Sequence, residues 1–103
     1  MVYLNQQSLN DLEKIREGFL TWKKFELSEA FIIGYVNQII DVCYSLDLKS
    51  FHFNNKFSKY KKYGAKLHTY KRNKQTQWYI IYNIDRHGNI FINHISSNHT
   101  TNR

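Results

Sequence analysis

The sequence predicts a small α+β domain in which an N-terminal antiparallel helical hairpin packs on a twisted, mainly antiparallel β-sheet. Three observations support this fold class. The first half of the chain repeats apolar residues every three or four positions, which is the period of a helix. The second half contains apolar, β-rich segments joined by short connections, as in β-hairpins. The chain has 103 residues, a length that favours one domain with a single core.

Two amphipathic helices are expected before residue 48. In the first, at about residues 8–24, Ser8 is the expected N-terminal cap. The second begins after Ser28, another capping residue, and continues to about residue 47. Because only a few residues connect them, the two helices are expected to form an antiparallel hairpin over about residues 8–47. The helical residues expected in the core are Leu12, Ile15, Phe19, Phe31, Tyr35 and Ile39.

The second half of the chain predicts a basic connector followed by a meander of strands. The connector is rich in Lys and aromatic residues, and one helical turn is expected in it around residues 58–63. The strands are joined by three-residue connections that suit hairpins. The expected segments, in chain order, are an extended start at Val2–Leu4, the connector at 48–65, strands at 66–73, 77–85 and 89–96 within a sheet region of 66–97, and a polar tail at 98–103 that frays.

Charge is distributed very unevenly along the chain. Residues 1–48 contain four Lys and Arg against seven Asp and Glu, whereas residues 49–103 contain eleven Lys and Arg against the lone Asp85. Such a concentration of positive charge opposes folding through self-repulsion, so a polyanionic partner is its simplest explanation. All five His residues and ten aromatic residues also lie in the second part. Aromatic rings among cations are typical of proteins that bind single-stranded RNA or DNA.

No sequence pattern supports several other kinds of site. The spacings typical of zinc ligands do not occur, and Cys43 has no second cysteine. We therefore expect no metal centre, no disulfide and no cofactor. The N-terminus lacks the form of a signal peptide, and no apolar stretch approaches the roughly 20 residues of a membrane span. These observations favour a cytoplasmic protein that does not associate with membranes.

Three segments of the chain carry a likeness to a known family. Residues 8–15, SLNDLEKI, have a small residue and a leucine before an acidic-leucine step. The run Tyr70-Lys71-Arg72 is followed by the apolar segment 78–85, and residues 89–95 form a last strand that contains a His. In these segments the chain resembles the RelE/ParE superfamily of toxins from type II toxin–antitoxin modules. One departure is Tyr79, which stands where the family usually has Arg.

The resemblance implies a function as well as a RelE/ParE-like fold. It implies the toxin of a toxin–antitoxin pair, neutralised by a smaller acidic antitoxin. The family contains ribosome-dependent mRNA endonucleases, for which the partners are the ribosome and mRNA, and this activity is the leading expectation. It also contains poisons of DNA gyrase, an alternative that the long hairpin and Tyr79 favour. A non-catalytic nucleic-acid-binding domain or degenerate toxin is the third alternative.

Candidate site residues follow from alternation along the strand at 66–73. One of its faces is expected to carry a His, a ring and a cation and to be open to solvent, while Leu67 and Thr69 face the helices. Metal-independent RNA cleavage needs groups that take the 2′-OH proton and protonate the leaving 5′-oxygen, and cations near phosphorus. The candidate catalytic residues are His68, Tyr70, Arg72 and His94. The Lys residues expected to bind nucleic acid are Lys59, Lys61, Lys62, Lys66 and Lys71.

Overall fold

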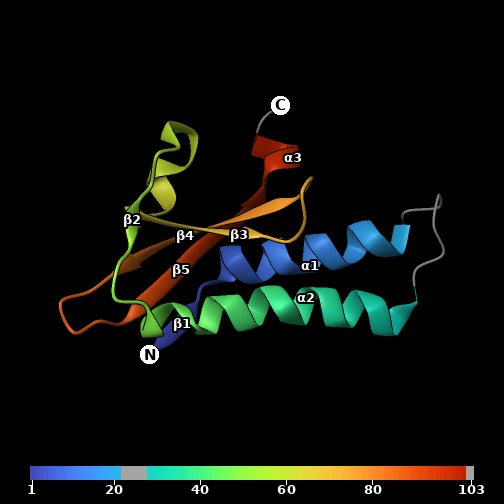
Figure 1. The fold of residues 1–103 in the computed structure, drawn as a ribbon, viewed down its shortest axis with the longest axis horizontal. Coiled ribbons are helices and arrows are strands. Elements are labelled where there is room, and N and C mark those ends of the chain that lie inside the picture. Colours follow the sequence, from blue (N-terminus) through green and yellow to red (C-terminus); the bar gives the residue numbers. More distant parts are fainter. Residues whose placement is uncertain (22–27, 102–103) are drawn as a thin grey trace.

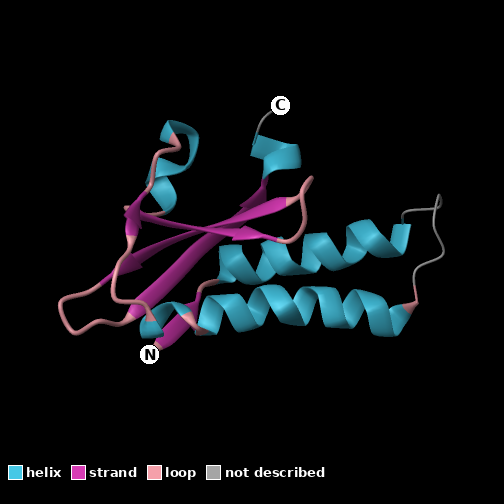
Figure 2. Cartoon of the chain, in the orientation of Figure 1, coloured by secondary structure: helices cyan, strands magenta, loops and turns pink. Residues whose placement is uncertain are grey.

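The computed structural model describes residues 1–21 and 28–101 of the chain, and it has the expected α+β class. Helices α1 (Gln6–Thr21) and α2 (Glu29–Tyr44) lie side by side on one face of a five-stranded sheet. Figures 1 and 2 show that both helices extend well past one end of the sheet. The hairpin therefore has a half that is packed on strands and a half that projects away from them.

The sheet has the strand order β1-β5-β4-β3-β2. Strand β1 is parallel to β5 and the other neighbours are antiparallel, so the expected meander forms its centre. The edge strand β2 was not predicted, because two residues are too short to show a periodicity. The bounds of the strands are β1 Val2–Leu4, β2 Phe53–Asn54, β3 Lys66–Lys71, β4 Gln77–Ile84 and β5 Ile90–Ser97.

The helix caps agree with the sequence in one helix and correct it in the other. Ser28 caps α2 as predicted, since its Oγ accepts the N–H of Phe31 at 3.1 Å. Helix α1 starts earlier than predicted, because Asn5 and not Ser8 caps it. The Asn5 side chain accepts the Ser8 N–H at 2.9 Å, and Ser8 itself is buried. The predicted end of this helix near residue 24 lies outside the described residues.

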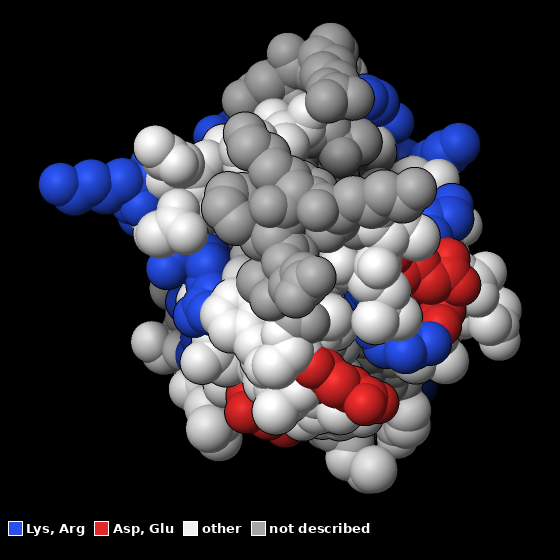
Figure 3. Space-filling view, turned by 90° about the vertical axis from the view of Figure 1, so that its right-hand side faces the viewer, with Lys and Arg blue, Asp and Glu red and all other residues white. Residues whose placement is uncertain are grey.

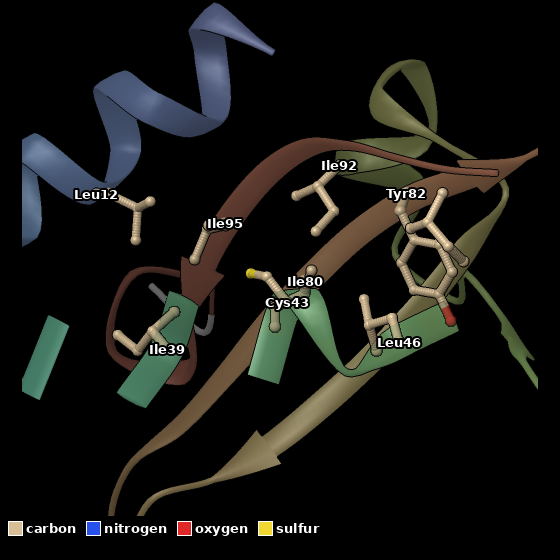
Figure 4. Packing of buried hydrophobic residues seen from close by; sticks show 9 residues of the cluster. Leu12, Ile39, Cys43, Leu46, Ile80, Tyr82, Ile92 and Ile95 are labelled. Atoms are coloured by element: carbon tan, nitrogen blue, oxygen red, sulfur yellow. The ribbon is translucent and has the colours of Figure 1, made fainter. Parts of the chain in front are cut away.

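The larger core lies between the helices and the sheet (Figure 4). Alternation along β4 turns Ile80 and Tyr82 toward it, and α2 contributes Ile39 and Cys43. Phe31 was expected here and is 45% exposed instead, because it belongs to the half of the hairpin beyond the sheet. The buried members of this cluster are Leu12, Ile39, Cys43, Leu46, Ile80, Tyr82, Ile90, Ile92 and Ile95.

A second, smaller core lies on the opposite face of the sheet, called here the outer face. The connector covers this face with the 3₁₀ helix η2 (Ser58–Tyr63), which confirms the helical turn predicted in the connector. The buried members of this second core, called here the outer core, are Tyr60, Leu67, Tyr79 and Ile81. The sheet is therefore covered on both faces, by a thick layer on one and a thin layer on the other.

Three short segments complete the description. A 3₁₀ turn, η1 (Leu46–Leu48), follows α2, and a short helix, α3 (Asn98–Thr101), occupies a segment that was expected to fray. Viewed from the hairpin tip, the carboxylates gather in the lower part of the molecule, over the helices, while most Lys and Arg lie above and to the sides (Figure 3). The charge asymmetry of the sequence thus becomes an asymmetry of layers.

Candidate active site

A bulge in β5 determines where His94 points. Ile81 of β4 pairs with His94, yet the next residue, Tyr82, pairs with Ile92, so Asn93 is an extra residue in β5. Residues directly opposite in an antiparallel pair share a face. Because Ile81 belongs to the outer core, the His94 ring lies on the outer face.

Two aromatic rings and a carboxylate hold the His94 ring. Tyr63 stacks on it with ring centroids 4.3 Å apart and an interplanar angle of 20°. The centroid of the Tyr60 ring lies 4.7 Å from that of the His94 ring, and the two ring planes are tilted by 52°. Asp11 Oδ2 lies 2.8 Å from Nδ1 of His94, which is the distance of an ion pair when the imidazole is protonated. The side chains of His94 and Asp11 are only 13% and 8% exposed, respectively.

Asp11 reaches His94 because α1 covers the edge of β5. Strand β1 pairs with β5 only as far as Ile92, and beyond that point the helix lies against the open edge. Asp11 Oδ2 also accepts the N–H of Ile95 at 2.9 Å, and Oδ1 accepts from Gln7 at 2.9 Å. One carboxylate therefore caps the strand edge and contacts the histidine.

The electrostatics of Asp11 follow from these contacts. Burial by itself raises the pKa of the Asp11 carboxyl, but His94 and the Ile95 N–H outweigh it, and the pKa is lowered overall. The carboxyl is therefore ionised at neutral pH despite its burial. An ionised carboxylate beside an imidazole orients the ring.

A cavity of about 670 Å³ opens beside His94. Lys14 of α1 and Lys59 of η2 line it, and Lys59 Nζ lies 5.2 Å from the centroid of the Tyr60 ring. Ser96 also lines the cavity, where its hydroxyl lies 3.1 Å from that of Tyr60. The cavity thus combines a held histidine with two cations and two hydroxyl groups, which suits an anionic ligand that exchanges a proton with the protein.

The expectation of an open face carrying His68, Tyr70 and Arg72 is wrong. His68 pairs with Ile80 and Tyr70 with Trp78, so this face of β3 lies on the helix side, and Leu67 is buried in the outer core. The alternation itself was correct, but it was assigned to the wrong faces. The sequence concealed this because the connector, which is not a regular layer, buries Leu67 as well as a helix would.

Two contacts hold Arg72 and Tyr70 against α2. The guanidinium of Arg72 donates to Gln38 Oε1 and lies 4.6 Å from the centroid of the Tyr35 ring. The Tyr70 hydroxyl donates to the same Gln38 oxygen at 3.4 Å. These two side chains are separated from His94 by the sheet, so the predicted residues do not form one site.

His68 lies in a second group of titratable residues on the helix side. Burial, with smaller contributions from Lys49 and His52, lowers the pKa of His68. Nearby, His52 Nδ1 lies 2.7 Å from the hydroxyl of Tyr82, and burial raises the pKa of Tyr82 to about 12. This group is packed between the connector and the core, and His68 lines a groove of about 330 Å³ that is separate from the His94 cavity.

The five predicted Lys residues are spread over several places. Lys59 lines the His94 cavity, whereas Lys61 and Lys62 line a separate hollow of about 480 Å³ on the other side of η2. Lys66 donates to Asn54 Oδ1 at 2.8 Å, and Lys71 is exposed on β3. One predicted Lys, Lys59, therefore lies in the same cavity as the predicted catalytic residue His94.

Sequence reasoning missed three neighbours of His94, namely Asp11, Tyr60 and Tyr63. Asp11 had a detectable signal, because it shares a helix face with Ser8, Leu12 and Ile15, and an acid on an apolar face rarely lacks a buried partner. The two tyrosines had no comparable signal, since irregular connectors do not show which rings face inward.

Comparisons with known proteins leave the fold and the site to be judged on their own geometry. No protein-family model, curated protein or solved structure matches the chain. Within the part of the chain that the structure describes, no helix combines the length and apolar character needed to cross a bilayer. Over the same residues, no three His, Cys, Asp or Glu side chains are arranged to hold a metal ion.

Proposed function

We propose that the chain is a toxin of a toxin–antitoxin pair that cleaves mRNA at the His94 cavity, as a metal-independent endoribonuclease acting on the ribosome. One observation carries the catalytic part of this proposal. His94 is fixed by Asp11 and by the Tyr63 ring, at a cavity lined by Lys14 and Lys59. The toxin part rests on the family resemblance, which also supplies the ribosome, mRNA and a small acidic antitoxin as partners.

The proposed chemistry is transesterification within the RNA chain. The 2′-oxygen attacks the adjacent phosphorus, the bond from phosphorus to the 5′-oxygen breaks, and a 2′,3′-cyclic phosphate and a 5′-hydroxyl result. His94 carries one of the two protons that must move, and ionised Asp11 holds its ring in place. Lys14 and Lys59 offset the charge that develops on the phosphoryl oxygens.

This proposal differs from the sequence expectation in its residues. His68, Tyr70 and Arg72 are left out of the reaction, since their contacts are with the helix-side core, Lys49 and α2. Tyr79 also loses its significance as a missing Arg, because the side chain is only 7% exposed in the outer core. The acid–base role stays with His94.

The test is cleavage of a defined mRNA in a purified translation system, with cut positions mapped on ribosome-bound codons. The His94→Asn variant should cleave at least about 100-fold more slowly, which is the usual contribution of a general acid or base. The control is His87→Asn in the exposed β4–β5 turn, which should cleave as the wild type does. Loss of cleavage in His68→Asn with retention in His94→Asn would reject this site.

A gyrase poison is the second candidate, and the shape of the hairpin favours it. The half that projects beyond the sheet exposes Leu20, Phe31 and Ile33, which are 54%, 45% and 48% exposed. Such a surface is suited to a protein target. In this case expression would cause double-strand DNA breaks with intact transcripts, and Phe31→Ser would abolish them while His94→Asn would not. Binding of RNA without either kind of damage would instead support the non-catalytic alternative.

A further inference from the structure

Strand β3 has an edge that is only half covered. Its neighbour β2 pairs with Lys66 and Leu67 alone. From His68 to Lys71 no strand of the described part lies against this edge. A strand with unpaired backbone groups is a template for pairing with another chain.

The hydrogen bonds of the preceding residues show which backbone groups point outward. The N–H of Asn55 donates to the carbonyl of Ala65 at 2.8 Å, and Phe53 pairs with Leu67. The carbonyl of Ala65 and the backbone groups of Leu67 therefore point toward this edge. Because direction alternates along a strand, Thr69 and Lys71 direct theirs to the same edge, beyond the end of β2.

A groove runs beside this edge. It has a volume of about 330 Å³ and is lined by Phe53, Leu67 and Thr69 together with Lys49 and Lys56. Its floor therefore contains apolar side chains, and its rim contains ammonium groups. The second part of the chain holds a single carboxylate, Asp85, in the β4–β5 turn. An occupant of the groove would have to supply the negative charge.

Exposed apolar side chains continue the groove along the connector. Leu48, Phe51 and Phe53 are 85%, 63% and 62% exposed. The Phe51 and Phe53 rings meet edge to face, with centroids 4.9 Å apart and planes at 81°. Perpendicular rings do not offer the parallel platform on which successive bases stack. They do form a pocket wall for apolar side chains of a peptide.

We propose that the free edge of β3 binds an extended acidic peptide segment of a partner protein, which adds to the sheet as a further strand. The backbone groups of Thr69 and Lys71 supply the pairing, the rings of Phe51 and Phe53 bind alternate apolar side chains, and nearby Lys residues attract the acidic ones. This surface goes beyond the proposed function, because it lies on β3 and the His94 cavity lies on β5. Only the identity of the partner as the antitoxin rests on the proposed function.

The first test uses a fluorescein-labelled decapeptide of alternating Glu and Val and the purified full-length chain. Two matched peptides serve as controls, one with Lys in place of Glu and one with N-methyl groups that block one set of backbone donors. Each control should bind at least about tenfold more weakly, a difference of about 1.4 kcal/mol. Equal binding of the N-methylated peptide would overturn strand addition.

The second test locates the peptide by amide hydrogen exchange. The Thr69 and Lys71 amides should exchange at least about tenfold more slowly in the complex, while the His94 ring signals stay unchanged. Protection near η2 and His94 without protection at β3 would overturn the proposal. So would a uridine decamer that protects the same β3 amides while the Glu-Val peptide does not, because the occupant would then be nucleic acid.

Two variants complete the test. Phe53→Ser should weaken peptide binding, whereas Phe91→Ser, at a ring 38% exposed on β5, should not. Thr69→Pro removes one outward N–H at an edge where proline is tolerated. Retained binding in both Phe53→Ser and Thr69→Pro would overturn the proposal, and unfolding of either variant leaves the comparison of peptides on the wild type as the deciding measurement. Cleavage of mRNA by Phe53→Ser should equal that of the wild type, so failure of this inference is distinct from failure of the ribonuclease.

Discussion

The two faces of the sheet differ in the thickness of what covers them, and this difference determines where a ligand has room. Two helices of 16 residues each cover one face, where Arg72 donates to Gln38 of α2 and both His68 and Arg72 are half-buried. A 3₁₀ helix of six residues covers the other face. That thin cover encloses Ile81 but leaves a cavity beside His94. A residue's chemistry alone did not indicate which of the two surroundings it would occupy.

Charge also differs between the two halves of the chain. On the side of the molecule that Figure 3 shows, the carboxylates gather in the lower part, and most Lys and Arg lie above and to the sides. Asp11 of the acidic half of the chain contacts His94 of the basic half. This contact joins the two halves of the chain at the cavity. Through it, a residue of helix α1 contacts a side chain on the outer face of the sheet.

The largest expected effect compares adjacent core residues on opposite faces. Ile80 and Ile81 are both 0% exposed, one under the helices and one under η2. Ile80→Ala should lower the free energy of unfolding by about 3 to 5 kcal/mol, and Ile81→Ala by about 2 to 3 kcal/mol, because the thin cover collapses more readily into the space left behind. Urea denaturation measures both. Equal costs would contradict the picture of a thick and a thin layer.

A substitution at Gly64 should loosen the outer cover specifically. A Cβ added there would lie 2.6 Å from the carbonyl oxygen of Tyr82, which is backbone and cannot rotate away. Gly64→Ala should therefore destabilise by about 1 to 3 kcal/mol. The ring signals of Tyr63 and His94 should shift in the NMR spectrum, because η2 moves off the sheet.

Gly18→Ala is the matched control for this substitution. Gly18 lies inside α1, and an added Cβ meets nothing within 4 Å. Alanine should stabilise the helix by roughly 0.5 to 1 kcal/mol. If Gly64→Ala proved as harmless as this control, the close approach of η2 to β4 would be refuted.

A smaller effect concerns the carboxylate that joins the two layers. Asp11→Asn keeps an acceptor for the Ile95 N–H and loses the charge, so it should cost about 1 kcal/mol at neutral pH. The pKa of Asp11 is lowered in the folded state, so its contribution is present above the ordinary carboxyl pKa of 3.8 and is lost as pH falls through the folded value. The wild type and the variant should therefore converge in acid. A constant difference at all pH values would show that the charge contact with His94 contributes nothing.

The smallest expected effect is the pH dependence of the helix side. The pKa of His68 is lowered below its ordinary 6.5, so the unfolded chain binds more protons than the folded one as pH falls through that range. Stability from this residue is complete above pH 6.5 and declines below it. In His68→Gln, thermal denaturation between about pH 8 and about pH 5 should show a weaker decline. An identical decline in wild type and variant would exclude His68 as its source.

The sequence predicted the elements well, because each depends on local physics. The helical hairpin, the Ser28 cap, the turn in the connector and the three central strands all follow from periodicity and capping within short windows. It also singled out His94, on a last strand in a basic half of the chain. Of the four catalytic candidates, this is the one that lies in a cavity with a carboxylate partner.

The tertiary structure alone decided which faces meet. Alternation divides β3 into two faces but does not say which one lies under the helices, and both faces of this sheet are buried. The extra residue at Asn93 turns His94 toward the outer face. Asp11, which lies far from His94 in the sequence, contacts it because β1 pairs with β5 only as far as Ile92 and leaves the rest of that edge to α1. Such contacts depend on how the layers pack and not on any local pattern. The sequence therefore determined which residues were available for this site, and the packing of two unequal layers determined which of them came together.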